Sequence, residues 1–382
     1  MHRRANLAEQ RIRRLVVKVG SQVLTAPGGL NLEVIAALAR QIEEILGRGT
    51  QVILVSSGAV ASGVRKIGLP GRPEELPRRQ AAAAVGQAGL IMEYEKAFER
   101  YHRLVAQILL TSEDLSSRKR YLNARNTLNT LLEWGIVPVV NENDTVSVEE
   151  IRLGDNDNLA AMITLLMDAD LLIVLSDIDG LYDQDPRRNP AARLIPEVTA
   201  GHRQIEKVAG ELPGELGTGG MRSKLSAARK VNTAGVPFVL ARGTEENVLI
   251  RILAGDPLGT YFAPRAGRLA RRKCWIAFSL KPRGNLALDA GAVNALVRQG
   301  KSLLASGITA VQGEFAVGAP VTLTGPGGEE IGVGLVNYSA ADIRRILGLH
   351  SRHIRQVLGE KPYDEVIHRD NLAVLAGGET EP

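Results

Sequence analysis

The chain has 382 residues, 45% of them hydrophobic and 23% charged, which is the balance of an ordinary soluble globular protein. That length exceeds a single small binding module, so at least two domains, each with its own core, are expected. The net charge is only +5 and aromatic residues make up 4% of the chain, so a surface for stacking nucleic-acid bases is not conspicuous.

Targeting and metal signals are weak. No window offers the roughly 18 uncharged apolar residues of a membrane span, and the basic N-terminus lacks the apolar run of a secretory signal. We therefore expect no membrane partner and a cytoplasmic location. The single cysteine, Cys274, cannot form an internal disulfide, and the six histidines show no metal-ligand spacing with it, so no structural metal site is expected.

Short apolar runs along the first two thirds of the chain predict buried strands. In chain order they cover residues 14–20, 51–56, 103–110, 136–140, 170–176 and 236–241. Longer segments with helical spacing lie between or after them, at residues 31–46, 80–101, 119–134, 158–167 and 221–234. Because strand and helix alternate, we predict a mainly parallel sheet with helices on both faces and ligands beyond the carboxyl ends of its strands.

From about Arg268 the sequence changes to short β-like runs separated by turn residues, which predicts a small β-rich domain. The runs are CWIAFSL (274–280), GITAVQGEF (307–315) and APVTLTGPGGEEIGVGLVNYS (319–339). A helix over AADIRRILG (340–348) follows, and the final GGETEP (377–382) is expected to be disordered. The predicted domains are residues 1–264 and 265–382.

Residues 265–283 contain seven basic side chains and no acidic one. Such a stretch is typical either of a surface for anions or RNA, or of a solvated linker and strand edge. A protein that chiefly binds RNA through its tail is therefore one alternative that the sequence leaves open.

Two common nucleotide signatures are missing. No G-x-x-x-x-G-K-[S/T] loop is present, and no G-x-G-x-x-G opens a helix after a strand, so phosphate-loop ATPases and dinucleotide dehydrogenases are not favoured. Instead, small polar loops follow several predicted strands, at residues 18–21, 56–59, 141–146 and 175–186. Backbone N–H groups in such loops hold anions well, and the recurrence of these loops at strand ends favours an anion site over tight turns alone.

Lysine usage points the same way. The chain has 11 lysines against 36 arginines, yet Lys18 and Lys224 both lie beside glycine-rich loops. A lysine is a compact charge on a long stem, suited to a phosphate that moves during transfer, although a pair of ordinary exposed lysines is the alternative.

The runs NENDTV (141–146) and GDNDNLA (154–160) are the densest polar clusters of the apolar half. Asp155 or Asn156 could simply cap the following helix, but capping needs one such residue and not four in a row. Alternating Asp and Asn supply carboxylates for an ammonium group or Mg²⁺ and amides for a carboxylate, so we favour a ligand site.

Together these motifs resemble the amino acid kinase family over nearly the whole chain. The segments that carry the resemblance are VVKVGSQVLT (16–25), VSSGAVASG (55–63), AAVGQAGL (83–90), YLNARNTLNTLLEWGIVPVVNENDTV (121–146), GDNDNLAAM (154–162), SDIDGLYDQDPRRNP (176–190) and GTGGMRSKLSAA (217–228). The pairing of NEND with GDNDNL is that of the glutamate-phosphorylating members, whereas acetylglutamate, aspartate, uridylate and carbamate kinases share the architecture without these loops in this form. The tail from Gly300 is similar to a PUA domain.

The resemblance implies a three-layer αβα sandwich, the amino acid kinase fold, as catalytic domain in residues 1–264, followed by a PUA-like domain in residues 265–382. It implies ATP-dependent phosphorylation of the side-chain carboxylate of L-glutamate to L-glutamyl 5-phosphate, the first step of proline biosynthesis, with Mg²⁺ entering as MgATP. Proline is then a candidate feedback inhibitor, a homo-oligomer is expected, and glutamyl phosphate reductase is a candidate functional partner. Kinases of aspartate or N-acetylglutamate remain the nearest alternatives.

Residue roles also follow from the resemblance. Lys18 and Lys224 would contact the phosphoryl group in flight, and Asp157 would orient the two lysines. Glutamate would be bound by Ser57, Asp144, Asp155 and Asn156. The ATP site would comprise Lys18, Ser176, Asp177, Thr218, Gly219, Gly220, Met221, Arg222, Ser223 and Lys224. No direct metal ligand is assigned, and no general base is expected, because a carboxylate with a pKa of about 4.3 is already ionised at neutral pH.

Overall fold

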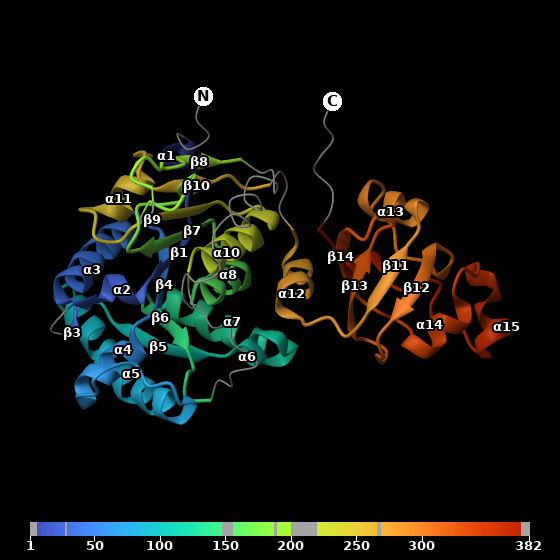
Figure 1. Ribbon diagram of the computed structural model, residues 1–382, viewed down its shortest axis with the longest axis horizontal. Helices are drawn as coiled ribbons and strands as arrows, with labels where there is room; N and C mark the ends of the chain where they lie inside the picture. The colour runs from blue at the N-terminus through green and yellow to red at the C-terminus, as the bar shows by residue number, and fades with distance from the viewer. Residues whose placement is uncertain are drawn as a thin grey trace. The chain divides into compact units, whose positions relative to one another are not determined.

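The structure is a computed structural model that describes residues 6–26, 29–146, 156–186, 189–199, 220–265 and 269–375. The chain forms two compact units, which divide between Arg265 and Ala266. Helices and strands alternate along the first unit, whereas the second is built around a separate small sheet (Figure 1). The predicted fold class, a mainly parallel α/β unit followed by a β-rich one, is confirmed.

An eight-stranded sheet runs through the first unit in the order β5-β6-β4-β1-β7-β9-β10-β8. Its strands are β1 (Arg14–Val19), β4 (Gln51–Ser56), β5 (Val105–Leu110), β6 (Val137–Glu142), β7 (Leu171–Ser176), β8 (Glu197–Val198), β9 (Phe238–Arg242) and β10 (Thr260–Phe262). All neighbouring strands are parallel except β9 and β10, which are antiparallel. All six strands predicted for this part of the chain are present, and a short hairpin of β2 (Thr25–Ala26) and β3 (Gly29–Leu30) lies outside the sheet.

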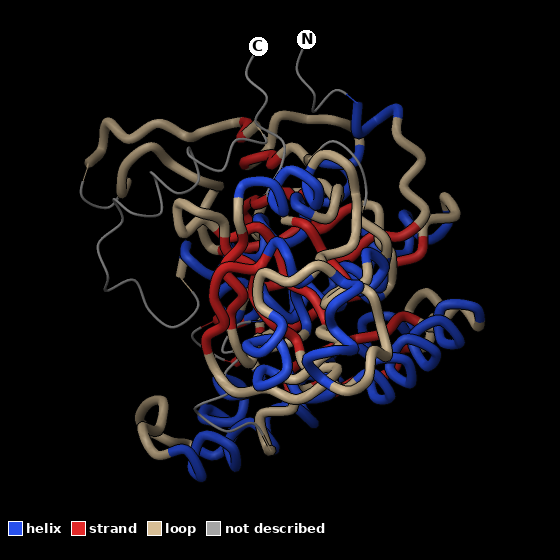
Figure 2. The backbone as a smooth tube through the Cα atoms, turned by 90° about the vertical axis from the view of Figure 1, so that its right-hand side faces the viewer, coloured by secondary structure: helices blue, strands red, loops and turns tan. Residues whose placement is uncertain are grey.

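Helices cover both faces of this sheet (Figures 1 and 2). One face packs against α3 (Leu32–Gly47), α5 (Leu76–Glu99) and α11 (Val248–Leu253), and the other against α7 (Arg118–Glu133), α8 (Asn156–Leu166) and α10 (Met221–Thr233). Side chains alternate along β1, so Val17 and Val19 join the core under α3 and α5, and Lys18 points to the opposite side. A lysine is thereby placed on the α8 and α10 face of an otherwise apolar strand.

A close helix crossing lies beside the carboxyl end of β4. The strand is followed by Ser57 and by Gly58, whose φ of 101° is left-handed, and α4 (Ala59–Ile67) begins there. A Cβ atom on Gly63 of α4 would lie 1.7 Å from the carbonyl oxygen of Ala82 in α5, and one on Gly86 of α5 would lie 1.8 Å from that of Ala59. The two glycines therefore let the backbones of α4 and α5 touch, which holds the middle of α5 near the turn after β4.

The second unit has a five-stranded sheet in the order β12-β11-β13-β14-β15. Its strands are β11 (Asn285–Leu288), β12 (Ile308–Gln312), β13 (Pro320–Thr324), β14 (Glu330–Leu335) and β15 (Leu372–Val374). Its helices are α12 (Arg271–Ser279), α13 (Ala290–Val297), α14 (Ala340–Ile346) and α15 (Ile354–Leu358). The unit has a hydrophobic core of its own, which includes Leu286, Val321 and Ile343.

One prediction for this unit is wrong. The run CWIAFSL was expected to be β-like, but Cys274 to Ser279 belong to α12. The helix buries Cys274, Trp275 and Ile276 and contacts β14 and β15, so burial against the small sheet outweighs the β propensity of these residues. The basic stretch 265–283 is accordingly neither a plain linker nor a strand edge, because nine of its residues are helical.

In the described part of the chain, no helix is long and apolar enough to span a membrane. The cytoplasmic location stays a prediction, and the terminal GGETEP lies outside the described residues.

The helix crossing makes a prediction about stability. Gly86→Ala should lower the free energy of unfolding by about 1–3 kcal/mol, because the new Cβ forces α4 and α5 apart. Gly89→Ala on the same helix is the matched control: its Cβ meets only the Ser62 hydroxyl at 3.7 Å, so the variant should gain about 0.5–1 kcal/mol from helix propensity. Urea unfolding of both variants measures the difference, and equal stabilities would contradict the tight crossing.

Candidate active site

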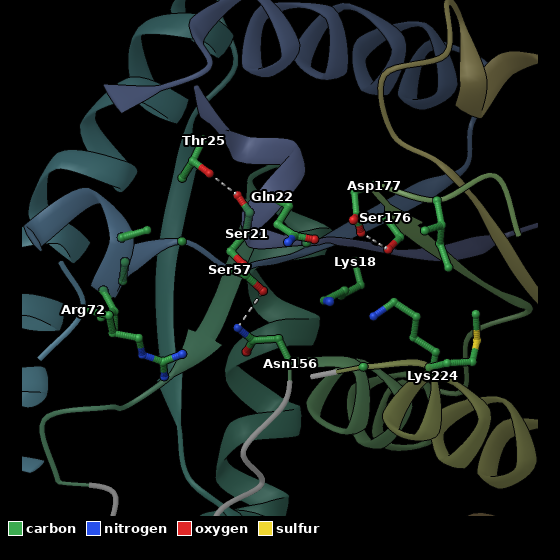
Figure 3. A pocket seen from close by; sticks show the side chains of 18 of the residues that line it. Lys18, Ser21, Gln22, Thr25, Ser57, Arg72, Asn156, Ser176, Asp177 and Lys224 are labelled. Carbon is green, nitrogen blue, oxygen red and sulfur yellow. Dashed lines mark hydrogen bonds between the residues drawn. The ribbon is translucent and has the colours of Figure 1, made fainter. Parts of the chain in front are cut away.

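A cavity of about 1120 Å³ opens at the carboxyl ends of β1, β4, β6 and β7. Lys18 comes from β1, Ser57 from the turn after β4, and Ser176 from the end of β7 (Figure 3). Gly220, Met221 and Lys224 at the beginning of α10 complete its wall. The cavity lies where an α/β sheet is expected to bind its ligands, and its volume suits a nucleotide with a second small molecule.

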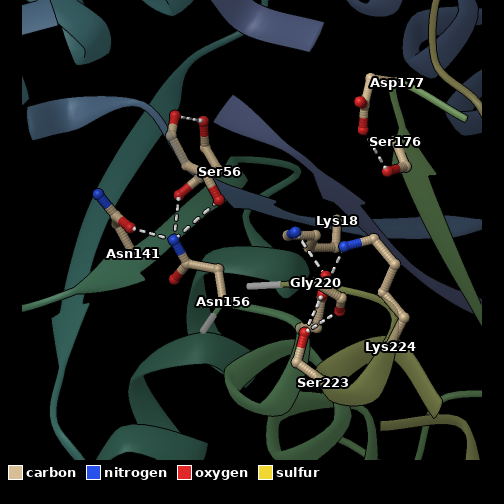
Figure 4. A network of polar contacts seen from close by, with 11 residues as sticks. Lys18, Ser56, Asn141, Asn156, Ser176, Asp177, Gly220, Ser223 and Lys224 are labelled. Carbon is tan, nitrogen blue, oxygen red and sulfur yellow. Dashed lines mark hydrogen bonds and ion pairs between the residues drawn. The ribbon is translucent and has the colours of Figure 1, made fainter. Parts of the chain in front are cut away.

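Two lysines flank one buried carboxylate at this cavity (Figure 4). The Nζ atom of Lys18 lies 2.5 Å from Oδ1 of Asp157, and the Nζ atom of Lys224 lies 3.0 Å from Oδ2. Asp157 is fully buried, whereas Lys18 and Lys224 retain 4% and 7% exposure and line the cavity. The Ser223 hydroxyl donates a further hydrogen bond to Oδ2 at 3.0 Å. The group carries a net positive charge toward the cavity, which suits a phosphate.

The same contacts determine the ionisation of Asp157. Burial alone would raise the pKa of its carboxyl group, but the charges of Lys18 and Lys224 and their hydrogen bonds outweigh burial and lower the pKa to about 2. The carboxylate is therefore charged throughout the physiological range. It holds the two ammonium groups in place without being available as a base.

The other end of the cavity is formed by neutral polar groups together with acidic and basic side chains. The Nδ2 of Asn156, the first residue of α8, donates hydrogen bonds of 2.9 Å to the Ser57 hydroxyl and to Oδ1 of Asn141. Asp144 follows β6, and burial raises the pKa of its carboxyl group, while the charges of Arg72 and Arg79 oppose that rise. Amide, hydroxyl, carboxylate and guanidinium groups here provide both donors and acceptors for an amino acid.

The strand β7 contributes a second polar corner. The Ser176 hydroxyl donates to Oδ1 of Asp177 at 3.0 Å. The Gln22 amide, oriented with its nitrogen toward Asp177, donates to both carboxylate oxygens at 2.9 and 2.7 Å. With the N-terminus of α10 opposite, this corner offers hydroxyl and backbone N–H groups to a nucleotide.

The structure brings most of the predicted site residues to one place. The cavity is lined by Lys18, Ser57, Asp144, Asn156, Ser176, Asp177, Gly220, Met221 and Lys224. Asp157 and Ser223 do not line the cavity. Asp157 contacts both lysines, and Ser223 contacts Asp157. Arg222 is exposed and does not line the cavity. Asp155, Thr218 and Gly219 lie outside the described residues. Their predicted roles stay predictions.

Several cavity residues escaped the sequence reasoning. Asn141 lies within NENDTV but was not singled out, and Gln22 follows Lys18 by four positions on a short helix. Arg72 belongs to an exposed stretch between α4 and α5, and nothing in its local sequence marks it as part of a site. Only the tertiary fold places it beside Asp144. Among the described residues, no group of three or more His, Cys, Asp or Glu could hold a metal ion.

Sequence comparison agrees with the fold. Residues 13–241 match the amino acid kinase family and residues 284–358 match the PUA domain. The match to the kinase family covers more than half of the chain. The fold and the cavity therefore define an amino acid kinase that carries a C-terminal PUA domain.

Curated relatives define the family further. A glutamate 5-kinase from Syntrophus aciditrophicus (strain SB) is 50% identical over 364 residues, 95% of this chain and 94% of the relative. Another from Geobacter metallireducens is 52% identical over 367 residues, 96% and 98% of the two chains. The chain belongs to the glutamate 5-kinase family. A solved structure of UMP kinase from Bacillus anthracis aligns with a TM-score of 0.48 at 14% identity, over 68% of this chain and 99% of that one.

The lowered pKa of Asp157 makes a prediction about stability and pH. A carboxyl group whose pKa is lower in the folded state stabilises the protein fully above its unfolded pKa of about 3.9, and that contribution is lost as the pH falls toward 2. Asp157→Asn cannot titrate there. The stability advantage of the wild type over this variant should therefore be largest near pH 6 and should shrink between pH 4 and pH 3. Urea unfolding at these pH values tests it, and a difference that does not change with pH would contradict the assignment.

Proposed function

We propose that this protein transfers the γ-phosphoryl group of ATP to the side-chain carboxylate of L-glutamate, which yields L-glutamyl 5-phosphate as the first step of proline biosynthesis. The observation that supports the proposal most directly is the pair Lys18 and Lys224 held on Asp157 at the cavity wall. Family membership supports the substrate, because the relatives carry the name glutamate 5-kinase. In this proposal residues 1–264 form the catalytic domain and residues 265–382 form the PUA-like domain.

The chemistry requires little proton transfer. The attacking carboxylate is ionised at neutral pH, so no general base is needed, and Asp157 is occupied by its two lysines. The obstacle is the repulsion between two anions and the need for in-line alignment. Lys18 and Lys224 offset that repulsion as negative charge moves between the γ-phosphoryl group and the leaving phosphate. Mg²⁺ enters as part of the substrate MgATP and shields the phosphate oxygens.

The two ends of the cavity then receive the two substrates. ATP is assigned to the corner of Ser176 and Asp177 and to the N-terminus of α10, where backbone N–H groups favour a phosphate. Glutamate is assigned to Ser57, Asn156 and Asp144, with the carboxyl group of Asp144 taking the α-ammonium group. The side-chain carboxylate of glutamate then extends toward the two lysines. The roles of Asp155, Thr218 and Gly219 in these sites are part of the same proposal.

Three further associations belong to the proposal. Proline carries the same α-amino and carboxylate groups as glutamate, so it can act as a feedback inhibitor. The labile acyl phosphate product calls for a reductase that consumes it promptly, and we propose functional coupling to glutamyl phosphate reductase. We also propose that the enzyme works as a homo-oligomer.

The reaction is tested by trapping the acyl phosphate with hydroxylamine. With MgATP, the purified protein should give hydroxamate from glutamate and little or none from aspartate or N-acetylglutamate. Lys224→Ala should reduce the rate at least about 100-fold, because it removes one of the two charges facing the transferring group. Circular dichroism checks that this variant is folded. If none of the three acids gives hydroxamate, the proposed reaction is wrong. If only aspartate or N-acetylglutamate gives hydroxamate, the reaction type holds but the proposed substrate is wrong.

Deleting the tail separates catalysis from RNA binding. A chain that ends at Pro264 should keep its kcat within about threefold, because the first unit has its own core and contains the whole cavity. A protein that works chiefly through RNA would instead lose its activity on deletion, and the full chain would bind structured RNA with a steep salt dependence. Hydroxamate assays on both chains, with RNA binding at two salt concentrations, distinguish the two.

A further inference from the structure

A chain of polar side chains connects α5 to the glutamate end of the cavity. Gln87 lies in the middle of α5, is 9% exposed, and does not itself line the cavity. Its Oε1 accepts a hydrogen bond of 2.6 Å from Nδ2 of Asn141, which lies in β6. Asn141 contacts Asn156, and Asn156 contacts Ser57 (Figures 3 and 4). A buried glutamine is thus linked to a cavity hydroxyl through two amides.

Backbone groups determine the orientation of the two asparagine amides in this chain. The N–H of Glu142 donates to Oδ1 of Asn141 at 2.9 Å, and a backbone N–H cannot accept. The Nδ2 of Asn141 must therefore point toward Gln87. At the next link, Nδ2 of Asn156 faces Oδ1 of Asn141 at 2.9 Å and the carbonyl oxygen of Ser56 at 3.3 Å. The reversed Asn156 amide would place an oxygen against both acceptors.

The consequence reaches the Ser57 hydroxyl. Its Oγ accepts a hydrogen bond of 2.9 Å from Nδ2 of Asn156, so its own proton is left to donate. Among the described residues no acceptor for that proton is found, and Ser57 lines the cavity. A hydroxyl group with this polarity is a donor toward the cavity, which is what an acceptor substrate with a carboxylate requires.

The position of Gln87 is itself held by the helix crossing. Gly86, the preceding residue, brings α5 against the backbone of Ala59 in α4, two residues after Ser57. The glutamine therefore cannot move away from β6 without opening that crossing. Its Oε1 stays where Asn141 needs an acceptor, even though the Nε2 of Gln87 is buried without a partner among the described residues.

We propose that Gln87 is a positioning residue for the acceptor substrate: by accepting from Asn141 it holds Asn141, and through it Asn156, in the place where the Ser57 hydroxyl is a donor toward a carboxylate of glutamate. This inference rests on the proposed function, because it assigns Ser57 to the glutamate end of the cavity. Gln87 touches no substrate, and its effect is confined to the binding of the acceptor. Gln87 does not affect ATP binding or the transfer step, because these depend on Lys18 and Lys224.

The first test compares two variants of similar length. Gln87→Met removes the acceptor oxygen and should raise the KM for glutamate about tenfold, because the Asn141 amide loses a buried hydrogen bond. The kcat and the KM for ATP should stay within about twofold. Gln87→Glu keeps an oxygen in the same place and should restore the KM to within about threefold of wild type. An unchanged KM in Gln87→Met, or an equal rise in Gln87→Glu, would overturn the proposal.

Gln41→Met is the matched control for a structural effect. Gln41 is also a buried glutamine, and its side chain bonds the backbone of Ala37 and Leu249, away from the cavity. Its replacement should lower the melting temperature with no change in the KM for glutamate. A rise in that KM equal to the rise in Gln87→Met would mean that Gln87 acts through general stability, against the proposal.

A double-mutant cycle with Ser57→Ala decides whether the effect passes through Ser57. If it does, the KM of Ser57→Ala with Gln87→Met should match that of Ser57→Ala alone within about twofold, because the hydroxyl is already gone. If the KM increases of the two single variants multiply in the double variant, the effect of Gln87 does not pass through Ser57 and the proposal is overturned. Wild-type protein that phosphorylates aspartate or N-acetylglutamate but not glutamate would contradict the proposed function alone, and the same cycle would then be measured on that acid.

Discussion

The burial of one carboxylate between two lysines is the interaction on which the site depends. Asp157 is fully buried, and a lone charge there would be strongly unfavourable, so its position requires Lys18 from β1 and Lys224 from α10. Each lysine, in turn, can remain nearly buried at a cavity wall because the carboxylate offsets its charge. Strand β1 and helices α8 and α10 are thereby fixed relative to one another, and a net positive charge is left facing the cavity. The two ammonium groups are therefore already in place when a phosphate enters, and they need not move to interact with it.

The cavity has two chemically different ends, and both follow from where strands of the sheet stop. Around the lysines the groups are cationic and rigid. Around Ser57, Asn141 and Asn156 they are mostly neutral, and backbone contacts determine which of them donate. A nucleotide phosphate needs charge, whereas an amino acid needs directional donors and acceptors, so the division matches the two substrates proposed. The close approach of Gly63 and Gly86 holds α5 beside this second end. Gln87 of α5 does not line the cavity itself.

Local sequence predicted the elements well where the pattern was strong. Continuous apolar runs marked six strands, β1, β4, β5, β6, β7 and β9, because parallel strands covered on both faces have no polar side. The same reasoning failed at α12, where the bulky run from Cys274 to Ile276 is helical. The β propensity of a residue reflects how well its side chain packs on a half-buried surface. Here that surface is formed by β14 and β15, which lie far along the chain. Where the packing partner is distant, propensity cannot identify it.

By itself, the sequence determined the class of fold, the change to a β-rich tail, and the motifs whose resemblance to amino acid kinases named Lys18, Lys224 and Asp157 as a group. It could not place Gln22, Arg72 or Gln87, because each looks like an ordinary helix or loop residue beside its own neighbours. The tertiary structure decided which side chains meet: Asn141 reaches Gln87 across 54 positions and Asp157 reaches Lys224 across 67. Contacts of that range depend on how strands are ordered in the sheet and how closely helices cross, and neither is encoded in a local pattern.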